Sequence, residues 1–398
     1  MSESDIKELV RKTSPVKAAA ARSQAAVDSG VSPHEWVGVV RNWRPPSDLH
    51  AMERPVDFAV DGLIPARKVG ALVAAGGTGK TTLQITLGVC IAIKRRFLGC
   101  DVQQGSFVLL SSDDSQEDLD GALARVVRAM KLTGAELELV KERVRVHSLQ
   151  GLGGDKTFAA MVNNAAAPTG LESLIVEALR GIDDLRVLGL DTLRQFSGGS
   201  SNDEQVIKLT IAGATEVARL TGCAVVVSHH TGKTNYRDGI TDMYCGSGSA
   251  AIADNCRFVL LLQSTTWSDI EAKVRRTGQE RGDPLVLQST RGSLLVKAPP
   301  AIYLHRDGFH IGRIAGATLS HEQVLDERDR AVLRAVRSGA QSKNAIASKV
   351  GGKKSSVLDR IDDLEARGHL RNGSPTGSQS RPHFILTSEG SKFLEPTE

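Results

Sequence analysis

The chain has 398 residues, of which 40% are hydrophobic and 24% are charged, as expected for a globular protein of two or three domains. Aromatic residues make up only 4%, so no stacking platform for single-stranded nucleic acid is evident. A net charge of +4 does not by itself indicate a nucleic-acid partner. The five cysteines lack metal-ligand spacing, and no stretch predicts a signal peptide or a membrane span. We therefore expect a cytoplasmic protein with no membrane partner.

Residues 1–50 are polar and rich in alanine, with one expected helix around Ser14–Ser29. This arm is predicted either to be weakly ordered or to dock on a neighbouring subunit.

A phosphate-binding loop is predicted between an apolar strand, Val69–Ala75, and a helix, Thr81–Lys94. Glycines let the backbone turn so that N–H groups and the positive end of the helix face a phosphate chain. Ala74 stands at the motif's first glycine position, which alanine tolerates with a negative φ. Lysine would reach the β- and γ-phosphates of ATP, and a threonine hydroxyl would hold Mg²⁺. The expected nucleotide-binding residues are Gly76, Gly77, Thr78, Gly79, Lys80, Thr81 and Thr82.

Two later strands end in carboxylates. Gly105–Ser112 leads to Asp113, which is predicted to polarise the attacking water; the alternative is a helix cap at this point, with Asp114 or Ser115 accepting from free N–H groups. Leu185–Asp191 is an apolar run that ends in an acid, so Asp191 is the expected Mg²⁺ ligand, held through water or Thr81. Both acids should lie at the carboxyl edge of a parallel sheet, beside the phosphate loop.

A further strand, Cys223–Val227, delivers His230 to the same edge. A neutral imidazole there would respond to the γ-phosphate; the alternative is a histidine that only ends the strand. The loop Thr231–Ser249 contains Lys233 and Arg237 and is too long for a simple connection.

The C-terminal region changes character. Residues 311–320 are small and predict a linker, and three helices are then expected at Asp326–Arg337, Ser342–Lys349 and Lys353–Arg367. Two strands, His369–Arg371 and His383–Thr387, would follow, which is the winged helix-turn-helix order. The third helix begins with residue types that contact DNA, and the alternative is a domain used for protein contacts. The candidate DNA-binding residues are Lys353, Lys354, Ser355 and Ser356.

The order of these motifs resembles the RepA-type hexameric replicative helicases of plasmids, which are RecA-like ATPases. The resemblance rests on the phosphate loop and on four further segments and covers roughly residues 57–310. Those segments are Ser111–Ser115, Leu190–Arg194, Ser228–His230 with Lys233, and Asp254–Arg257.

The resemblance implies a ring, expected to be a hexamer, with nucleotide between subunits. Arg257 is similar to the family's arginine finger, and Lys297 to a second basic residue at that interface. Lys233 and Arg237 would touch single-stranded DNA in the central channel. The family usually carries glutamate where this chain has Asp113, which puts tight positioning of the water in doubt.

We therefore expect an α/β protein with a RecA-like P-loop core, a mostly parallel sheet and a small winged helix-turn-helix domain. The expected function is ATP-driven unwinding or translocation on DNA during replication of a plasmid, phage or mobile element. The alternatives are a DNA-binding regulator switched by nucleotide and a recombination or repair ATPase. The expected divisions are an arm (1–50), the ATPase domain (51–312), a linker (313–322) and the winged domain (323–398).

Overall fold

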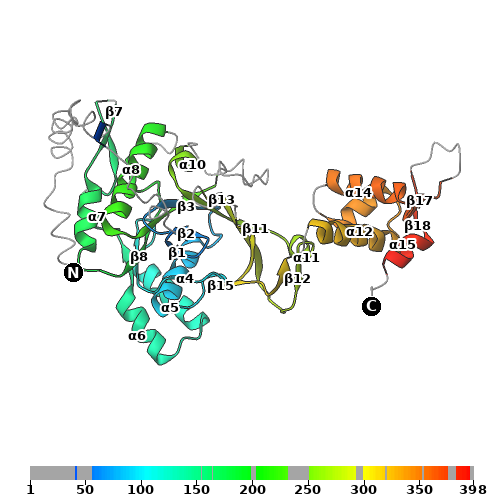
Figure 1. Ribbon diagram of the computed structural model, residues 1–398, viewed down its shortest axis with the longest axis horizontal. Coiled ribbons are helices and arrows are strands. Elements are labelled where there is room, and N and C mark those ends of the chain that lie inside the picture. The colour runs from blue at the N-terminus through cyan, green and yellow to red at the C-terminus, as the bar shows by residue number, and fades with distance from the viewer. Residues whose placement is uncertain are drawn as a thin grey trace. The chain divides into compact units, whose positions relative to one another are not determined.

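The computed structural model describes residues 41–42, 56–153, 155–163, 165–198, 203–231, 251–292, 299–318, 321–351, 354–374 and 382–394 (Figure 1). Its contacts divide the chain into two compact units. The first comprises Met1–Ser264 and Leu285–Arg313, and the second Thr265–Pro284 and Ile314–Glu398. The helix expected around Ser14–Ser29 lies outside the described residues.

The first unit is built on one large sheet, to which nine of the described strands contribute. The strands from β11 through β3, β10, β8 and β4 to β5 are parallel, whereas β13 runs antiparallel to β11, and β15 antiparallel to β14. The mostly parallel α/β fold is thereby confirmed. The order across the sheet is β15 (His310–Arg313), β14 (Ile302–Asp307), β13 (Asp283–Gly292), β11 (Phe258–Ser264), β3 (Val69–Ala74), β10 (Ala224–His230), β8 (Leu185–Asp191), β4 (Ser106–Ser111) and β5 (Val144–Ser148).

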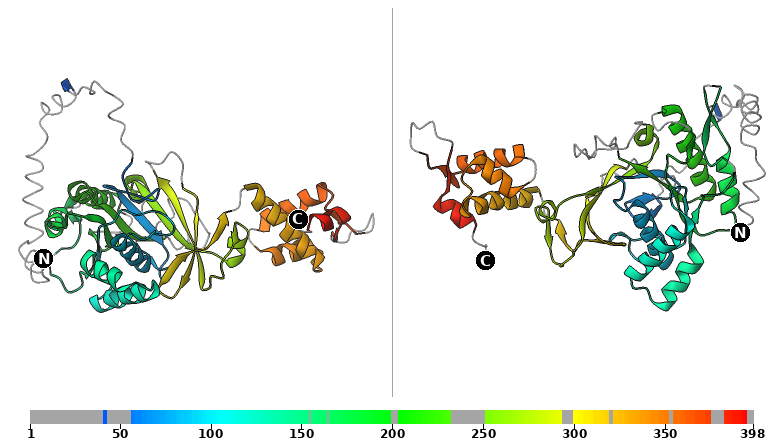
Figure 2. Two further views of the ribbon diagram at one scale, coloured as in Figure 1. Left: turned by 60° about the horizontal axis from the view of Figure 1, so that its bottom comes forward. Right: turned by 180° about the vertical axis from the view of Figure 1, so that it is seen from behind.

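Helices cover both faces of this sheet (Figure 2). One face packs against α4 (Lys80–Ile93), α5 (Gln116–Ala129) and α6 (Gly134–Arg143), and the other against α7 (Leu171–Leu179), α8 (Glu204–Thr221) and α10 (Ala251–Asn255). Alternate residues of β3 supply the two cores: Leu72 faces the first helical layer, and Ala71 and Val73 face the second. A strand buried on both faces requires the continuous apolar run that the sequence shows.

Two glycines let bulky side chains reach the sheet and its helices. A Cβ at Gly70 would lie 2.3 Å from the ring of Phe258, and one at Gly88 would lie 2.3 Å from the ring of Phe107. Both phenylalanines are buried. Because there is no room for a methyl group, substitution by alanine at either glycine would overpack the core.

Smaller elements surround the sheet, and several were not expected. Helix α6 was missed although Thr133 and Glu136 form a capping box at its start. The hairpin of β6 and β7 was missed because its strands are rich in alanine, which has low β-propensity. The described strands of the first unit that lie outside the large sheet are β1 (Phe58–Val60), β2 (Ile64–Pro65), β6 (Ala159–Val162), β7 (Ala165–Pro168) and β9 (Ser197–Gly198).

The second unit contains four helices at its C-terminal end and two short antiparallel pairs, β12 with β16 and β17 with β18, within the described part. Much of the range 313–322, predicted as a linker, has regular structure: β16 falls there and pairs with β12, and the next helix begins at His321. Small residues suit this strand because Gly316 has a φ of 151° and a Cβ there would strike the Arg275 carbonyl. The elements are α11 (Trp267–Glu271), β12 (Val274–Arg276), β16 (Gly316–Thr318), α12 (His321–Arg337), α13 (Lys343–Val350), α14 (Lys354–Ala366), β17 (Leu370–Asn372), β18 (Phe384–Leu386) and α15 (Ser388–Phe393).

A separate core holds the C-terminal helices together, with Leu333, Ile346, Ile361 and Phe384 among its buried members. The order of three helices followed by an antiparallel pair agrees with the winged helix-turn-helix expectation, and that assignment stays a prediction. In the described part of the chain, no helix is both long and apolar enough to span a membrane.

Candidate nucleotide-binding site

The predicted phosphate loop joins the end of β3 to the start of α4. Gly77 and Gly79 have φ values of 75° and 107°, which favour glycine, whereas Ala74 completes β3 and is not among the residues with positive φ. Gly79 precedes the first turn of α4. Among the described residues, no acidic side chain lies in this turn and no side chain caps its N–H groups. Its N–H groups and the helix dipole therefore suit an anion.

Lys80 is buried in this loop, with 7% of its surface exposed. Its Nζ donates hydrogen bonds to the carbonyl oxygens of Ala74 (3.1 Å) and Ala75 (3.2 Å). Burial lowers the pKa of Lys80, and the carboxylates of Asp191 and Asp113 oppose that shift. The ammonium group is thus held at the loop with acids on one side of it.

His230 meets Lys80 at the carboxyl end of β10. Lys80 Nζ lies 3.2 Å from His230 Nδ1, and because an ammonium group can only donate, the ring nitrogen accepts this hydrogen bond. Partial burial, followed by the charges of Lys80 and Arg194, lowers the pKa of His230. The lowered pKa favours the neutral form of the imidazole, and the role of His230 as a sensor of the γ-phosphate stays a prediction. Arg194, to which the sequence assigned no role, lies near the same ring.

Asp191 is fixed by a buried hydrogen-bond network. Thr81 Oγ1 donates to Asp191 Oδ2 at 2.8 Å, and Gln84 Nε2 donates to Ser228 Oγ at 2.6 Å. Burial raises the pKa of Asp191, while hydrogen bonds from Thr81 and Ser228 oppose the shift. Gly189 leaves room for this network, because a Cβ there would lie 2.2 Å from Gln84 Oε1. Ser228 and Gln84 thus act as supports that sequence reasoning missed.

The Thr81 hydroxyl and the Asp191 carboxylate offer oxygen atoms of the kind that Mg²⁺ binds. Among the described residues, no group of three or more histidine, cysteine or acidic side chains is placed to hold a metal ion. Mg²⁺ takes few ligands from a protein and completes its shell with water and substrate phosphates. One hydroxyl from Thr81 and one carboxylate from Asp191 meet that need.

The acidic loop after β4 contains two candidate carboxylates. Ser115, one of the two residues considered for the helix cap, caps α5 by accepting from the N–H of Asp118. Asp113 is exposed, and its charge acts on both Lys80 and His230. Burial, followed by the charges of Asp113 and Asp118, raises the pKa of Asp114, and a hydrogen bond with Thr81 opposes that shift. Asp114 therefore lies beside Thr81, the residue that is predicted to hold Mg²⁺.

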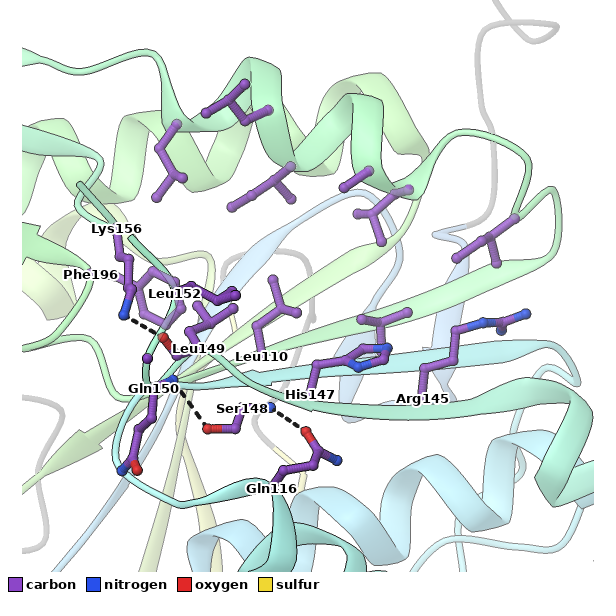
Figure 3. Close-up of a pocket in the computed structure, with 18 of the residues that line it drawn as sticks. Leu110, Gln116, Arg145, His147, Ser148, Leu149, Gln150, Leu152, Lys156 and Phe196 are labelled. Carbon is purple, nitrogen blue, oxygen red and sulfur yellow. Dashed lines mark hydrogen bonds between the residues drawn. The ribbon is translucent and has the colours of Figure 1, made fainter. Parts of the chain in front are cut away.

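Side chains beside β5 hold the backbone of this acidic loop, and Figure 3 shows three of them, Gln116, Ser148 and Gln150, among the residues that line a cavity. Gln150 Nε2 donates to the Asp113 carbonyl at 2.7 Å, and Ser148 Oγ donates to the Asp114 carbonyl at 2.7 Å. Gln116 in turn accepts from the Ser148 N–H at 2.8 Å. These three residues line a cavity of about 870 Å³ between β5 and α7. The acidic loop is therefore held by its backbone while the Asp113 side chain stays exposed.

Arg257 lies at the opposite end of the sheet from its own phosphate loop. Its N–H donates to the Val69 carbonyl at the start of β3, and its side chain is exposed. The loop follows Ala74 at the other end of that strand, so about 17 Å of strand separates the two at 3.3 Å per residue. Arg257 is therefore poorly placed to serve the nucleotide of its own chain.

The remaining predicted residues are less informative. Lys233, Arg237, Lys297 and Lys353 lie outside the described residues. In α14, Lys354 and Ser355 are exposed, whereas Ser356 accepts a hydrogen bond from Arg328 at 3.3 Å.

Ion pairs occupy several basic side chains of the C-terminal helices. Arg360 pairs with buried Asp329 at 2.6 Å, Arg367 pairs with the same acid, and Lys343 pairs with Asp362. These three cations belong to the eight Lys and Arg residues of 341–383, whose excess over four acids in the sequence favours contact with DNA. Since they are already paired within the unit, less positive charge remains for DNA than the sequence suggests.

Residues 41–236 match the family model described as an AAA domain. The matched region contains the phosphate loop, Asp113, Asp191 and His230, and it ends before Arg257. The geometry of the loop and the mostly parallel sheet agree with that match. This part of the chain is accordingly an AAA domain, a P-loop ATPase module of the RecA-like kind.

Proposed function

We propose that the protein is an ATP-driven motor that assembles as a ring and unwinds or moves along DNA, as RepA-type helicases do. The position of Arg257 carries this proposal. The chain has the parts of an ATPase site at the carboxyl ends of its strands, while the residue that resembles the finger lies at their amino ends. A second copy of the chain, placed with its Arg257 against this chain's loop, would supply the missing charge.

Within such an assembly each of the predicted site residues would have its own role in ATP hydrolysis. The loop N–H groups and Lys80 would bind the phosphates of ATP, and Thr81 and Asp191 would hold Mg²⁺, which supplies positive charge to the phosphate oxygens. Asp113 would orient a water whose oxygen bonds to the γ-phosphorus as the bond to the β–γ bridging oxygen breaks. His230, neutral and next to Lys80, would register loss of the γ-phosphate. The partner's Arg257 would stabilise the charge of the transition state.

DNA unwinding tests this function directly. With Mg²⁺ and ATP, the wild-type protein is expected to release a labelled strand from a forked duplex, measured by fluorescence. Lys80→Ala should release none, because the loop loses the charge that binds the β- and γ-phosphates. Lys208→Ala, which removes an exposed lysine on α8, should behave as the wild type.

Two results would speak against a motor. One is ATP hydrolysis by the wild type with no strand release on forks that carry either a 5′ or a 3′ single-stranded arm. The other is nucleotide-dependent binding to a particular duplex without unwinding, which would favour the regulator that is the alternative function.

A further inference from the structure

An arginine far along the chain reaches the phosphate loop from its other side. Arg306 lies near the end of β14, and its Nη1 donates to the Gly77 carbonyl at 2.5 Å. Its Nε donates to the Gly308 carbonyl at 3.1 Å, which fixes the direction of the guanidinium. A Cβ at Gly79 would lie 3.5 Å from the guanidinium carbon and 3.3 Å from Ile311 Cδ1. The turn from β14 to β15 therefore stands against the outer side of the loop.

The order of strands indicates which end of a bound nucleotide this turn faces. Asp191, Asp113 and His230 lie at the carboxyl ends of β8, β4 and β10, all on one side of β3. Because the metal ligand, the water-orienting acid and the γ-phosphate sensor lie there, that side receives the γ-phosphate. β14 and β15 lie on the other side of β3, beyond β11 and β13. A phosphate chain that crosses the loop would leave its nucleoside on the side of Arg306.

We propose that Arg306 binds the nucleoside end of ATP held by the same chain, with its planar guanidinium stacked on the purine base. The inference rests on the proposed ATP binding and adds a residue that recognises the base. A guanidinium stacks well on an aromatic face because it is flat, always charged and weakly hydrated. The apolar end of Ile311 beside Gly79 gives the same surface an aliphatic part.

Binding of ATP and of inorganic tripolyphosphate to the full-length protein separates a base contact from a phosphate contact. Both ligands are measured with Mg²⁺ by displacement of a fluorescent ATP analogue. Arg306→Ala is expected to weaken ATP binding by about 5- to 30-fold and to leave tripolyphosphate binding unchanged. Arg306→Lys keeps the charge but lacks the planar guanidinium, so its affinity for ATP should lie between those of the wild type and Arg306→Ala. Arg128→Ala, an exposed arginine on α5, is the matched control.

Three results with the Arg306 variants would overturn this assignment. An equal loss for ATP and tripolyphosphate would place Arg306 on the phosphates or make it a support of the loop. Unchanged ATP binding would remove it from the site, and tighter binding would make it an obstacle that the nucleotide displaces. If the wild type and Arg128→Ala both fail to bind ATP, the proposed function fails and the inference falls with it. A loss confined to the Arg306 variants leaves the proposed function standing.

Discussion

Arg257→Ala is expected to lower the rate of ATP hydrolysis by about 10³- to 10⁵-fold while leaving ATP binding close to that of the wild type. The reason is that an arginine finger acts on the charge of the transition state, whereas the loop and Lys80 bind the ground state. Arg257→Lys should restore little of the rate, because an ammonium lacks the flat fork that pairs with two phosphate oxygens. Steady-state hydrolysis and binding of a fluorescent nucleotide measure the two effects separately.

Mixing two inactive proteins tests whether Arg257 acts on a neighbour. Lys80→Ala keeps the finger and lacks a working loop, and Arg257→Ala has the opposite defect. An interface that combines the finger of the first with the loop of the second is complete, so the mixture should recover part of the hydrolysis. Absence of recovery in mixtures shown to co-assemble, or full activity of Arg257→Ala by itself, would contradict a role between subunits.

The second large effect concerns the two acids after β4. Asp113→Asn should lower the rate of hydrolysis by about 10²- to 10⁴-fold, the usual contribution of a positioned base, with little change in the Mg²⁺ requirement. Asp114→Asn should instead raise the Mg²⁺ concentration needed for half-maximal rate by about 10- to 100-fold, because this carboxylate supports Thr81. Titrations of rate against Mg²⁺ distinguish these outcomes.

Two further variants complete that comparison. Asp113→Glu should retain hydrolysis, since glutamate is the residue that the resembled family places there. Glu117→Gln removes an exposed acid at the start of α5 and should change nothing. If Asp113→Asn hydrolyses ATP like the wild type while Asp114→Asn is inactive at any Mg²⁺ concentration, Asp114 is the base.

The sequence predicted the central strands well because a strand that is buried on both faces requires a continuous run of apolar residues. The range Leu185–Asp191 was predicted with the bounds that β8 has, and the phosphate loop was placed between the correct strand and helix. Continuous apolar runs that end in glycine or aspartate have few other interpretations. The C-terminal helices were found from their periodic apolar residues, although α12 begins five residues earlier than expected.

The contacts that complete the site could not be predicted in this way, because they join residues that are far apart along the chain. Arg306 is 229 residues from Gly77 along the chain. Neither strand of the hairpin that carries it, β14 or β15, was predicted. Gln84 and Ser228, 144 residues apart, meet only because α4 packs on the sheet beside β8 and β10. Pairings of this kind depend on the register of distant strands, which local periodicity does not specify. Asp114 was considered as a cap for the next helix, and only the fold shows that it lies beside Thr81.

Steady-state ATP hydrolysis with and without single-stranded DNA tests most directly whether this AAA domain couples ATP turnover to DNA. The wild type is expected to hydrolyse ATP, single-stranded DNA to raise the rate, and Lys80→Ala to abolish both the basal and the stimulated rate. Hydrolysis that is lost in Lys80→Ala but insensitive to single-stranded DNA at saturating concentration would contradict the motor and leave a P-loop ATPase with another task.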